Sequence, residues 1–277
     1  MSNSKYIRTL VLQYKPSHDS QKTVSKLESM LIKHNVEKNT IVVCPELSIQ
    51  DYMCIEKDKR LLNKAISISS SFIIELKAIA KKYRIILCIT IFEKFKDKYF
   101  NKLIVINSEG DIILKYNKKK IPSESCYQEK FYFDNASNNF KFFEVDGNKI
   151  GVLICWDQWH HESYAYMKKN NINLIVCPTA IGQCKVNKKM ITIINEKKKW
   201  FEVIKSNSLM INTPVVICNR IGIESHGNSS ISFWGNSFIT DSNGNLVKKA
   251  GSSEGVLYHK FMIRDQITAK RLWNFID

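Results

Sequence analysis

The stretch KIGVLICWDQW, Lys149–Trp159, joins a continuous apolar run to a cysteine, a tryptophan and an acid. Continuous apolar runs are typical of strands that are covered on both faces. Strand ends are where α/β proteins build their sites, and a charge placed there is costly to bury unless it is paired. The stretch therefore predicts a buried strand over residues 149–155 that presents Cys155 at its end.

Similar runs recur along the chain and alternate with helical patterns. Strands are predicted at residues 6–14, 40–46, 85–92, 102–108, 111–116, 140–145, 172–178, 214–220, 231–240 and 254–261. Helices are predicted at residues 20–35, 69–83, 162–170 and 196–212, the first with Val24, Leu27, Leu31 and Ile32 on one stripe. This order predicts one domain, residues 1–277, with a layered α/β architecture.

Composition narrows the class of protein. The 277 residues are 44% hydrophobic, enough for a substantial core, and carry a net charge of +16. Such a charge can indicate a nucleic-acid partner, but the lysines lie in short runs along the whole chain, which favours solvated surfaces. A basic nucleic-acid-binding protein remains the alternative to an enzyme. No apolar stretch has the length of a signal peptide core or a membrane span, so we expect a cytoplasmic protein without membrane contact.

The eight cysteines and the paired histidines give no metal signature. No CxxC pair occurs, and the adjacent His160 and His161 cannot share one helix face. We therefore predict no metal site. Four cysteines lie in or beside apolar runs and are predicted to be buried thiols in a reducing compartment: Cys44, Cys88, Cys177 and Cys218.

Three polar signals each follow a predicted strand: Glu46 in CPELS, Lys118 in KYNKKKIP, and Cys155. Each alone has a plain structural explanation, since a lone cysteine at a strand end is usually part of a core. Together they supply what thiol catalysis needs. A thiol requires a base, and attack on an amide or ureido carbonyl builds an oxyanion that requires a fixed positive charge.

The motifs CPEL, YNKKKIP, YQEKFYF and GVLICWDQW, in this order, resemble those of the nitrilase superfamily of carbon–nitrogen hydrolases. The resemblance covers nearly the whole chain and is closest to the N-carbamoylputrescine amidase branch, which NRIGIE and FWGNSFI also resemble. It implies a nitrilase-type four-layer α-β-β-α sandwich, no metal or organic cofactor, and a homodimer or higher homo-oligomer.

The resemblance also implies a role for each matched residue. Glu46 would be the general base, Cys155 the nucleophile and Lys118 the oxyanion-stabilising lysine, chosen over its two lysine neighbours by its place in the motif. Glu129 would hold Lys118, and the backbone N–H of Trp156 would be a second oxyanion donor.

Substrate recognition is less well defined by the motifs. We expect substrate contacts from Tyr52, Glu124, Trp156, Asp157 and Glu162. The chain departs from the branch pattern at Ile49, Asn117, Lys120, His160, His161 and Ala165. The first expectation is hydrolysis of N-carbamoylputrescine to putrescine, CO2 and ammonia, in polyamine biosynthesis. An ω-amidase or a β-ureidopropionase-like amidase is the alternative.

Overall fold

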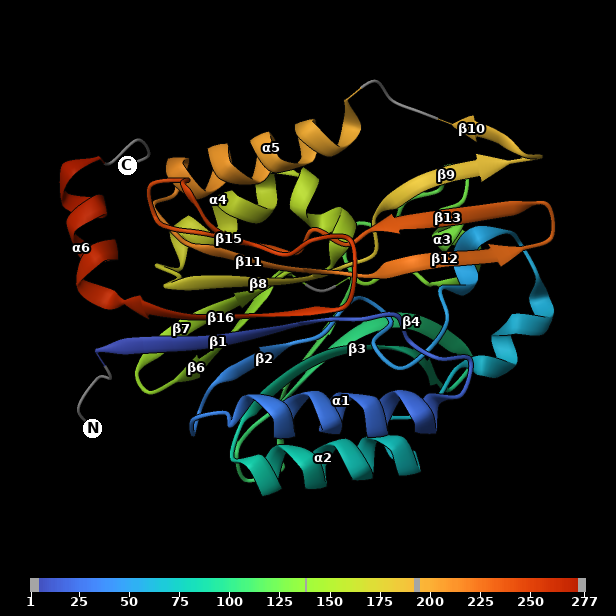
Figure 1. Ribbon diagram of the computed structural model, residues 1–277, viewed down its shortest axis with the longest axis horizontal. Coiled ribbons are helices and arrows are strands. Elements are labelled where there is room, and N and C mark those ends of the chain that lie inside the picture. Colours follow the sequence, from blue (N-terminus) through green and yellow to red (C-terminus); the bar gives the residue numbers. More distant parts are fainter. Residues whose placement is uncertain (1–4, 138, 192–194, 274–277) are drawn as a thin grey trace.

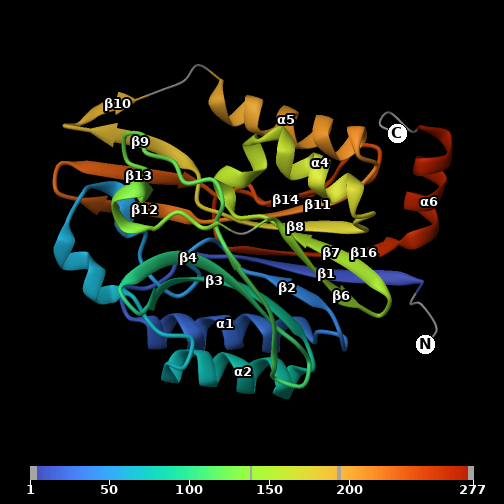
Figure 2. The same ribbon diagram turned by 180° about the vertical axis from the view of Figure 1, so that it is seen from behind.

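The computed structural model describes residues 5–137, 139–191 and 195–273, and these residues form four layers. Two six-stranded sheets pack face to face, with helices α1 and α2 on the outer side of one and α4 and α5 on the outer side of the other (Figure 1). Figure 2 shows the same layers from behind. This arrangement confirms the predicted α-β-β-α sandwich.

The first sheet has the strand order β16-β1-β2-β3-β4-β5. Its strands are β1 (Tyr6–Gln13), β2 (Ile41–Val43), β3 (Ile86–Phe95), β4 (Lys98–Ile106), β5 (Ile112–Asn117) and β16 (Gly255–Met262). Strands β1, β2 and β3 are parallel, and the other pairs are antiparallel. Glu46 lies three residues beyond Val43, the last residue of β2, and Lys118 directly follows β5.

The second sheet has the order β15-β14-β11-β8-β7-β6, in which β7, β8 and β11 are parallel. Its strands are β6 (Lys141–Val145), β7 (Asn148–Val152), β8 (Leu174–Thr179), β11 (Val215–Asn219), β14 (Phe238–Thr240) and β15 (Leu246–Lys249). A smaller sheet, β10-β9-β13-β12, extends beyond the carboxyl ends of β8 and β11. Its strands are β9 (Gly182–Val186), β10 (Lys189–Ile191), β12 (Ile221–His226) and β13 (Ser229–Trp234).

The predicted helices are confirmed with small shifts at their ends. They are α1 (Ser20–His34), α2 (Ser71–Tyr83), α4 (His161–Lys169) and α5 (Glu196–Met210). The side chain of Asp19 caps α1 by accepting hydrogen bonds from two backbone N–H groups of the first turn. Val24, Leu27 and Leu31 are buried, but Ile32 is 61% exposed, so the prediction that Ile32 shares their stripe was wrong.

Apolar side chains fill each space between the layers. One cluster packs α1 and α2 against the first sheet, and includes Leu10, Leu27 and Leu76. A second lies between the two sheets and reaches α5 through Trp200. A third, smaller cluster gathers near the loops that follow β2 and β5 and includes Tyr52. The catalytic candidates lie among buried side chains as a result.

Some predicted boundaries were wrong. Strand β7 ends at Val152, and Cys155 instead begins a short 3-10 helix, η3 (Cys155–Trp159). The predicted strand 231–240 is two strands, β13 and β14, which belong to different sheets. Gly235, at φ 58°, lies in the turn between them. Elements without a sequence prediction are β9, β10, β12, β15, α3 (Glu129–Tyr132), α6 (Ile263–Leu272), η1 (Met53–Ile55) and η2 (Lys59–Lys64).

Cys126 and Cys184 form a disulfide, with Cα atoms 6.0 Å apart, that joins the segment before α3 to β9. No such pair was predicted. The remaining six cysteines are buried free thiols, and these include the four predicted ones. Within the described ranges, no helix combines the length and apolar character needed to cross a membrane.

Candidate functional site

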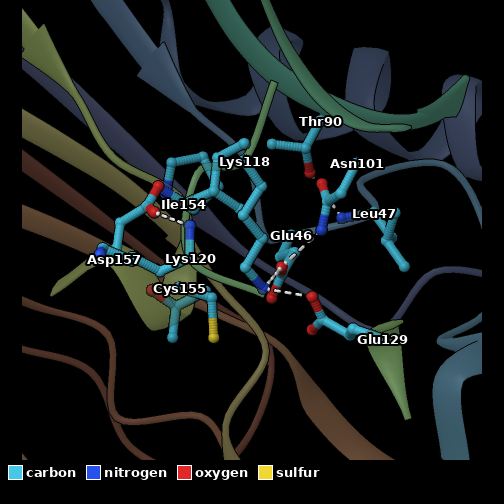
Figure 3. Close-up of polar contacts among 12 residues, drawn as sticks. Glu46, Leu47, Thr90, Asn101, Lys118, Lys120, Glu129, Ile154, Cys155 and Asp157 are labelled. Carbon is cyan, nitrogen blue, oxygen red and sulfur yellow. Dashed lines mark hydrogen bonds and ion pairs between the residues drawn. The ribbon is translucent and has the colours of Figure 1, made fainter. Parts of the chain in front are cut away.

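Four side chains from separate elements converge where the carboxyl ends of the central strands meet. Glu46 follows β2, Lys118 follows β5, Glu129 begins α3, and Cys155 begins η3 after β7 (Figure 3). All four are 5% exposed or less. The topology therefore brings together residues that lie far apart in the sequence.

Lys118 lies between two carboxylates. Its Nζ donates hydrogen bonds to Glu46 Oε1 at 2.7 Å and to Glu129 Oε2 at 2.6 Å. Burial lowers the pKa of the ammonium group, but the charges of Glu129 and Glu46 outweigh this and hold that pKa well above its usual value. Lys118 is therefore a fixed positive charge. The neighbouring Lys119 and Lys120 instead extend towards Glu162.

The Glu46 carboxylate is held on one side only. Oε1 accepts hydrogen bonds from Lys118 and from Asn101 Nδ2, the latter at 2.7 Å. Oε2 is buried and has no hydrogen-bond partner in the described part of the chain. A buried acceptor without a partner is costly. The second oxygen is therefore ready to accept a proton from a group that enters the site.

Glu129 is held on both sides. Besides the bond from Lys118, it accepts a hydrogen bond at Oε1 from the hydroxyl of Tyr52, at 2.7 Å. Burial raises its pKa to about 7, although Lys118 lowers that pKa in turn. Its geometry suits orientation of the lysine better than proton transfer to a substrate.

Cys155 has a left-handed backbone, with φ 39°, which is uncommon for a side chain other than glycine. The turn is stabilised because Gln158 Nε2 donates to the Cys155 carbonyl at 2.7 Å. Gln158 Oε1 in turn accepts from Trp200 Nε1 at 2.9 Å, which ties the turn to α5. Burial and the charge of Glu46 raise the pKa of the Cys155 thiol well above its usual value, while Lys118 lowers it. The resting group is a thiol that needs a nearby base.

Asp157 supports this turn from inside the protein. It is fully buried, and its carboxylate accepts hydrogen bonds from the backbone N–H of Ile154 and Lys120 and from the hydroxyl of Tyr116. Burial raises its pKa to about 6. Through these three hydrogen bonds, the Asp157 carboxylate connects the turn at Cys155 to the residues on either side of Lys118.

The other predicted substrate contacts lie in different surroundings. Tyr52 is buried and contacts Glu129, while Trp156 is half-buried beside Cys155. Glu124 is exposed, and Glu162 is exposed and paired with Lys120 Nζ at 2.7 Å. The structure thus gathers Tyr52 with the four central residues and places Glu124 and Glu162 at the surface.

Three residues that contact this cluster were not assigned a role from sequence. Asn101 donates to Glu46, and Arg220 and Glu224 contact the backbone of the loop after β2. Arg220 and Glu224 lie in NRIGIE, which was noted only as a matching stretch. No local pattern distinguishes Asn101 from the other asparagines of the chain. Among the described residues, no three His, Cys, Asp or Glu side chains are grouped to hold a metal ion.

Comparison with known proteins agrees with this geometry. The family model described as carbon-nitrogen hydrolase matches residues 9–269. A citrullinase of Francisella tularensis is 31% identical over 257 residues, which cover 92% of this chain and 88% of that protein. An N-carbamoylputrescine amidase of Solanum tuberosum is 30% identical over 274 residues, 97% of this chain and 90% of that protein.

Solved structures show the same fold. A carbon-nitrogen hydrolase from Helicobacter pylori G27 superposes with a TM-score of 0.88 and 25% identity, covering 98% of this chain and 94% of that one. The family model, the relatives and this structure agree on a hydrolase that acts on carbon–nitrogen bonds other than peptide bonds. The chain belongs to the carbon–nitrogen hydrolase family.

Proposed function

We propose that the protein hydrolyses a linear ureido or amide compound, with Cys155 as nucleophile, Glu46 as general base and Lys118 as oxyanion stabiliser. The observation that carries this proposal is the Lys118 ammonium group, fixed between Glu46 and Glu129 beside a buried thiol. The unpartnered Oε2 of Glu46 supports its part as proton acceptor.

The proposed reaction proceeds in two halves. Glu46 takes the thiol proton, and the Cys155 sulfur bonds to the carbonyl carbon while its oxygen becomes negative. Lys118, with the backbone N–H of Trp156, stabilises that oxyanion in a buried site, where such electrostatic contacts are stronger than in bulk water. The carbon–nitrogen bond then breaks, and the leaving nitrogen takes the proton from Glu46. Glu46 next activates a water molecule, which cleaves the bond between sulfur and the carbonyl carbon and restores the thiol. From a ureido substrate that has lost ammonia, this releases a carbamic acid, which decomposes to CO2 and the amine.

A ureido substrate is supported by the two relatives together. Citrulline and N-carbamoylputrescine, the substrates that their names indicate, both carry a terminal carbamoyl group on a short aliphatic chain. Our first candidate is N-carbamoylputrescine, which would yield putrescine, CO2 and ammonia for polyamine synthesis. Citrulline is the second candidate, favoured by the 31% identical relative. A single domain, a cytoplasmic location and a homo-oligomer stay predictions.

The test is ammonia release from a panel of N-carbamoylputrescine, citrulline, N-carbamoyl-β-alanine and an ω-amide. We expect turnover of at least one carbamoyl compound, and intact-protein mass spectrometry is expected to show an adduct on the peptide that carries Cys155. Cys155→Ala should lose both signals while it keeps its fold, as measured by circular dichroism. Retained turnover in that variant contradicts the mechanism.

A matched pair of lysine variants tests the second assignment. Lys118→Ala should lose activity, while Lys119→Ala should keep it. Of these two lysines, only Lys118 contacts Glu46 and Glu129. The opposite result would move the oxyanion role to the neighbouring residue.

A further inference from the structure

Arg220 is a buried charge directly behind the candidate site. It follows β11, and its side chain is 0% exposed. Its guanidinium lies 5.3 Å from the ring of Phe233 and pairs with the carboxylate of Glu224. A buried ion pair contributes little net stability compared with apolar residues of the same volume, because desolvating the charges is costly. The presence of this pair therefore needs an explanation beyond stability.

The guanidinium contacts one loop at three points. Its NH1 group donates to the carbonyls of Glu46 and Leu47, at 2.7 and 2.9 Å, and NH2 donates to the carbonyl of Gln50 at 3.1 Å. This loop has no helix or strand of its own, and Leu47 has a left-handed backbone with φ 49°. Such a backbone persists only where its surroundings hold it. Arg220 supplies part of that restraint from the second sheet, and Thr90 in β3 supplies another part by accepting a hydrogen bond from the Leu47 N–H.

Glu224 continues the connection to the far end of the same loop. Its Oε1 pairs with Arg220, and its Oε2 accepts a hydrogen bond from the backbone N–H of Tyr52 at 2.7 Å. The hydroxyl of Tyr52 contacts Glu129, the second carboxylate on Lys118. One ion pair thus restrains the backbone of both Glu46, which contacts Lys118, and Tyr52, which contacts Glu129.

The backbone of Arg220 also meets the Cys155 side of the site. The carbonyl of Thr179 accepts hydrogen bonds from the N–H groups of Arg220 and Glu46, at 3.2 and 3.3 Å. The next residue, Ala180, interacts through its backbone with Cys155 and lowers the pKa of that thiol. Loops from both large sheets are therefore joined within one hydrogen-bonded group.

We infer that Arg220, paired with Glu224, is a positioning residue that sets Glu46 and Tyr52 against Lys118 and Cys155. The inference rests on the proposed function, since it concerns the placement of the proposed base. The planar guanidinium is essential to it, because a lysine ammonium group presents a point charge and cannot hold three carbonyls and a carboxylate in one plane.

The test is Arg220→Lys, which keeps the charge and changes the geometry. We expect kcat for ammonia release to fall by about 100-fold, since small displacements of a catalytic group have effects of this size. KM should change by less than about threefold, because Arg220 contacts no group proposed to bind the substrate directly. Retention of kcat within about threefold of the unchanged protein overturns the inference.

Glu93→Gln is the matched control. Glu93 is a buried carboxylate that pairs with Lys102, so its replacement also breaks a buried ion pair. Both variants should lower Tm, but Glu93→Gln should keep kcat. If Glu93→Gln lowers kcat as much as Arg220→Lys does, the effect follows from general destabilisation and the inference fails. If Arg220→Lys does not fold, Glu224→Gln takes its place, with an expected fall in kcat of about tenfold.

A second readout separates this inference from the proposed function. The rate at which iodoacetamide alkylates Cys155, followed on its peptide by mass spectrometry, depends on proton removal and not on any substrate. Arg220→Lys should slow this alkylation by about tenfold, and Glu93→Gln should not change it. If the unchanged protein turns over none of the substrates but the three proteins show this alkylation pattern, the result contradicts the proposed substrate class and leaves the positioning role intact. Equal alkylation rates in all three proteins contradict the positioning role.

Discussion

Glu46 and Glu129 make the same contact with Lys118 and differ in almost everything else. Glu46 lies in the loop after the parallel strand β2, and its Oε2 has no hydrogen-bond partner within the described ranges. Glu129 lies on a four-residue helix, and both of its oxygens accept hydrogen bonds, from Lys118 and Tyr52. A carboxylate with an open acceptor can exchange a proton, whereas one with two partners holds its neighbour in place. On this contrast we propose different roles for the two carboxylates: Glu46 exchanges the proton and Glu129 holds Lys118.

Replacement of Glu46, the carboxylate with an oxygen that has no partner, is the strongest test of this difference between the two residues. Glu46→Gln keeps the size of the side chain but cannot take the thiol proton, so we expect kcat to fall by at least about 10³-fold. Ammonia release measures this effect, and thermal unfolding shows whether the fold survives. Glu144→Gln, an exposed position on β6, is the control and should keep full activity. Activity above about one tenth of the original would contradict a base role for Glu46.

Replacement of Glu129, whose two oxygens both accept hydrogen bonds, should lower kcat less than replacement of Glu46. Glu129→Gln still offers an oxygen to Lys118, but its charge is lost, so the lysine is held less firmly and its pKa falls. We expect kcat to decrease by about 10²-fold, a smaller loss than for Glu46→Gln, with KM nearly unchanged. The same ammonia assay measures both variants side by side. A larger loss for Glu129→Gln than for Glu46→Gln would reverse the division of roles.

The two carboxylates also differ in how their segments are held. The Glu46 loop is restrained by the buried side chain of Arg220, while the segment before Glu129 is restrained covalently by the Cys126–Cys184 disulfide. The adjacent Tyr127 reinforces the second restraint, since its hydroxyl donates to the Gly182 carbonyl and accepts from the Gly182 N–H. Both restraints join segments that meet only after folding.

Loss of the disulfide should therefore affect Glu129 more than Glu46. The double variant Cys126→Ser, Cys184→Ser opens a loop of 58 residues, which lowers the free energy of unfolding by about 4 kcal/mol in a chain-entropy model. We expect kcat to fall by about tenfold at a temperature where the variant stays folded. Denaturant unfolding and ammonia release measure the two effects.

Reduction of the unchanged protein is the internal control for this prediction. Treatment with a phosphine reductant should lower kcat to the value of the double variant, because both leave the Glu129 segment without its cross-link. The double variant itself should not respond to the reductant. Equal kcat values for the oxidised, reduced and doubly substituted proteins would show that Tyr127 and its neighbours hold Glu129 without the disulfide.

Apolar patterns predicted the strands and helices, and the family motifs pointed to four residues that the structure brings together, but neither predicted the contacts that hold them. Strands and helices follow from local apolar periodicity, and Glu46 and Cys155 are close to strand ends. Arg220 instead contacts the Glu46 carbonyl across 174 residues, and Cys126 pairs with Cys184 across 58. No periodicity encodes such pairs. Strands β9, β10 and β12 of the smaller sheet were missed for a related reason, since each is short and partly polar.

The mildest way to sharpen the comparison is Tyr52→Phe, which removes one hydrogen bond from Glu129 and none from Glu46. Glu129 must be ionised to pair with Lys118, and its pKa is about 7, so kcat/KM should rise with pH through neutrality. The Tyr52 hydroxyl lowers that pKa, and its loss should move the midpoint upward and reduce activity near pH 7 by about threefold. Tyr258→Phe, which removes a hydroxyl bonded to Glu37 at the surface, should leave the profile unchanged.

Stability should respond to pH with the opposite sign. Because the pKa of Glu129 is raised from 4.5 to about 7, the folded protein binds a proton there that the unfolded chain has already released. By linkage, this contribution to stability is fully present below pH 4.5 and is lost as pH rises to about 7. In Tyr52→Phe the loss should extend to higher pH. Denaturant unfolding at several pH values measures this shift, and a midpoint that moves downward in either experiment contradicts the assigned role of the Tyr52–Glu129 contact.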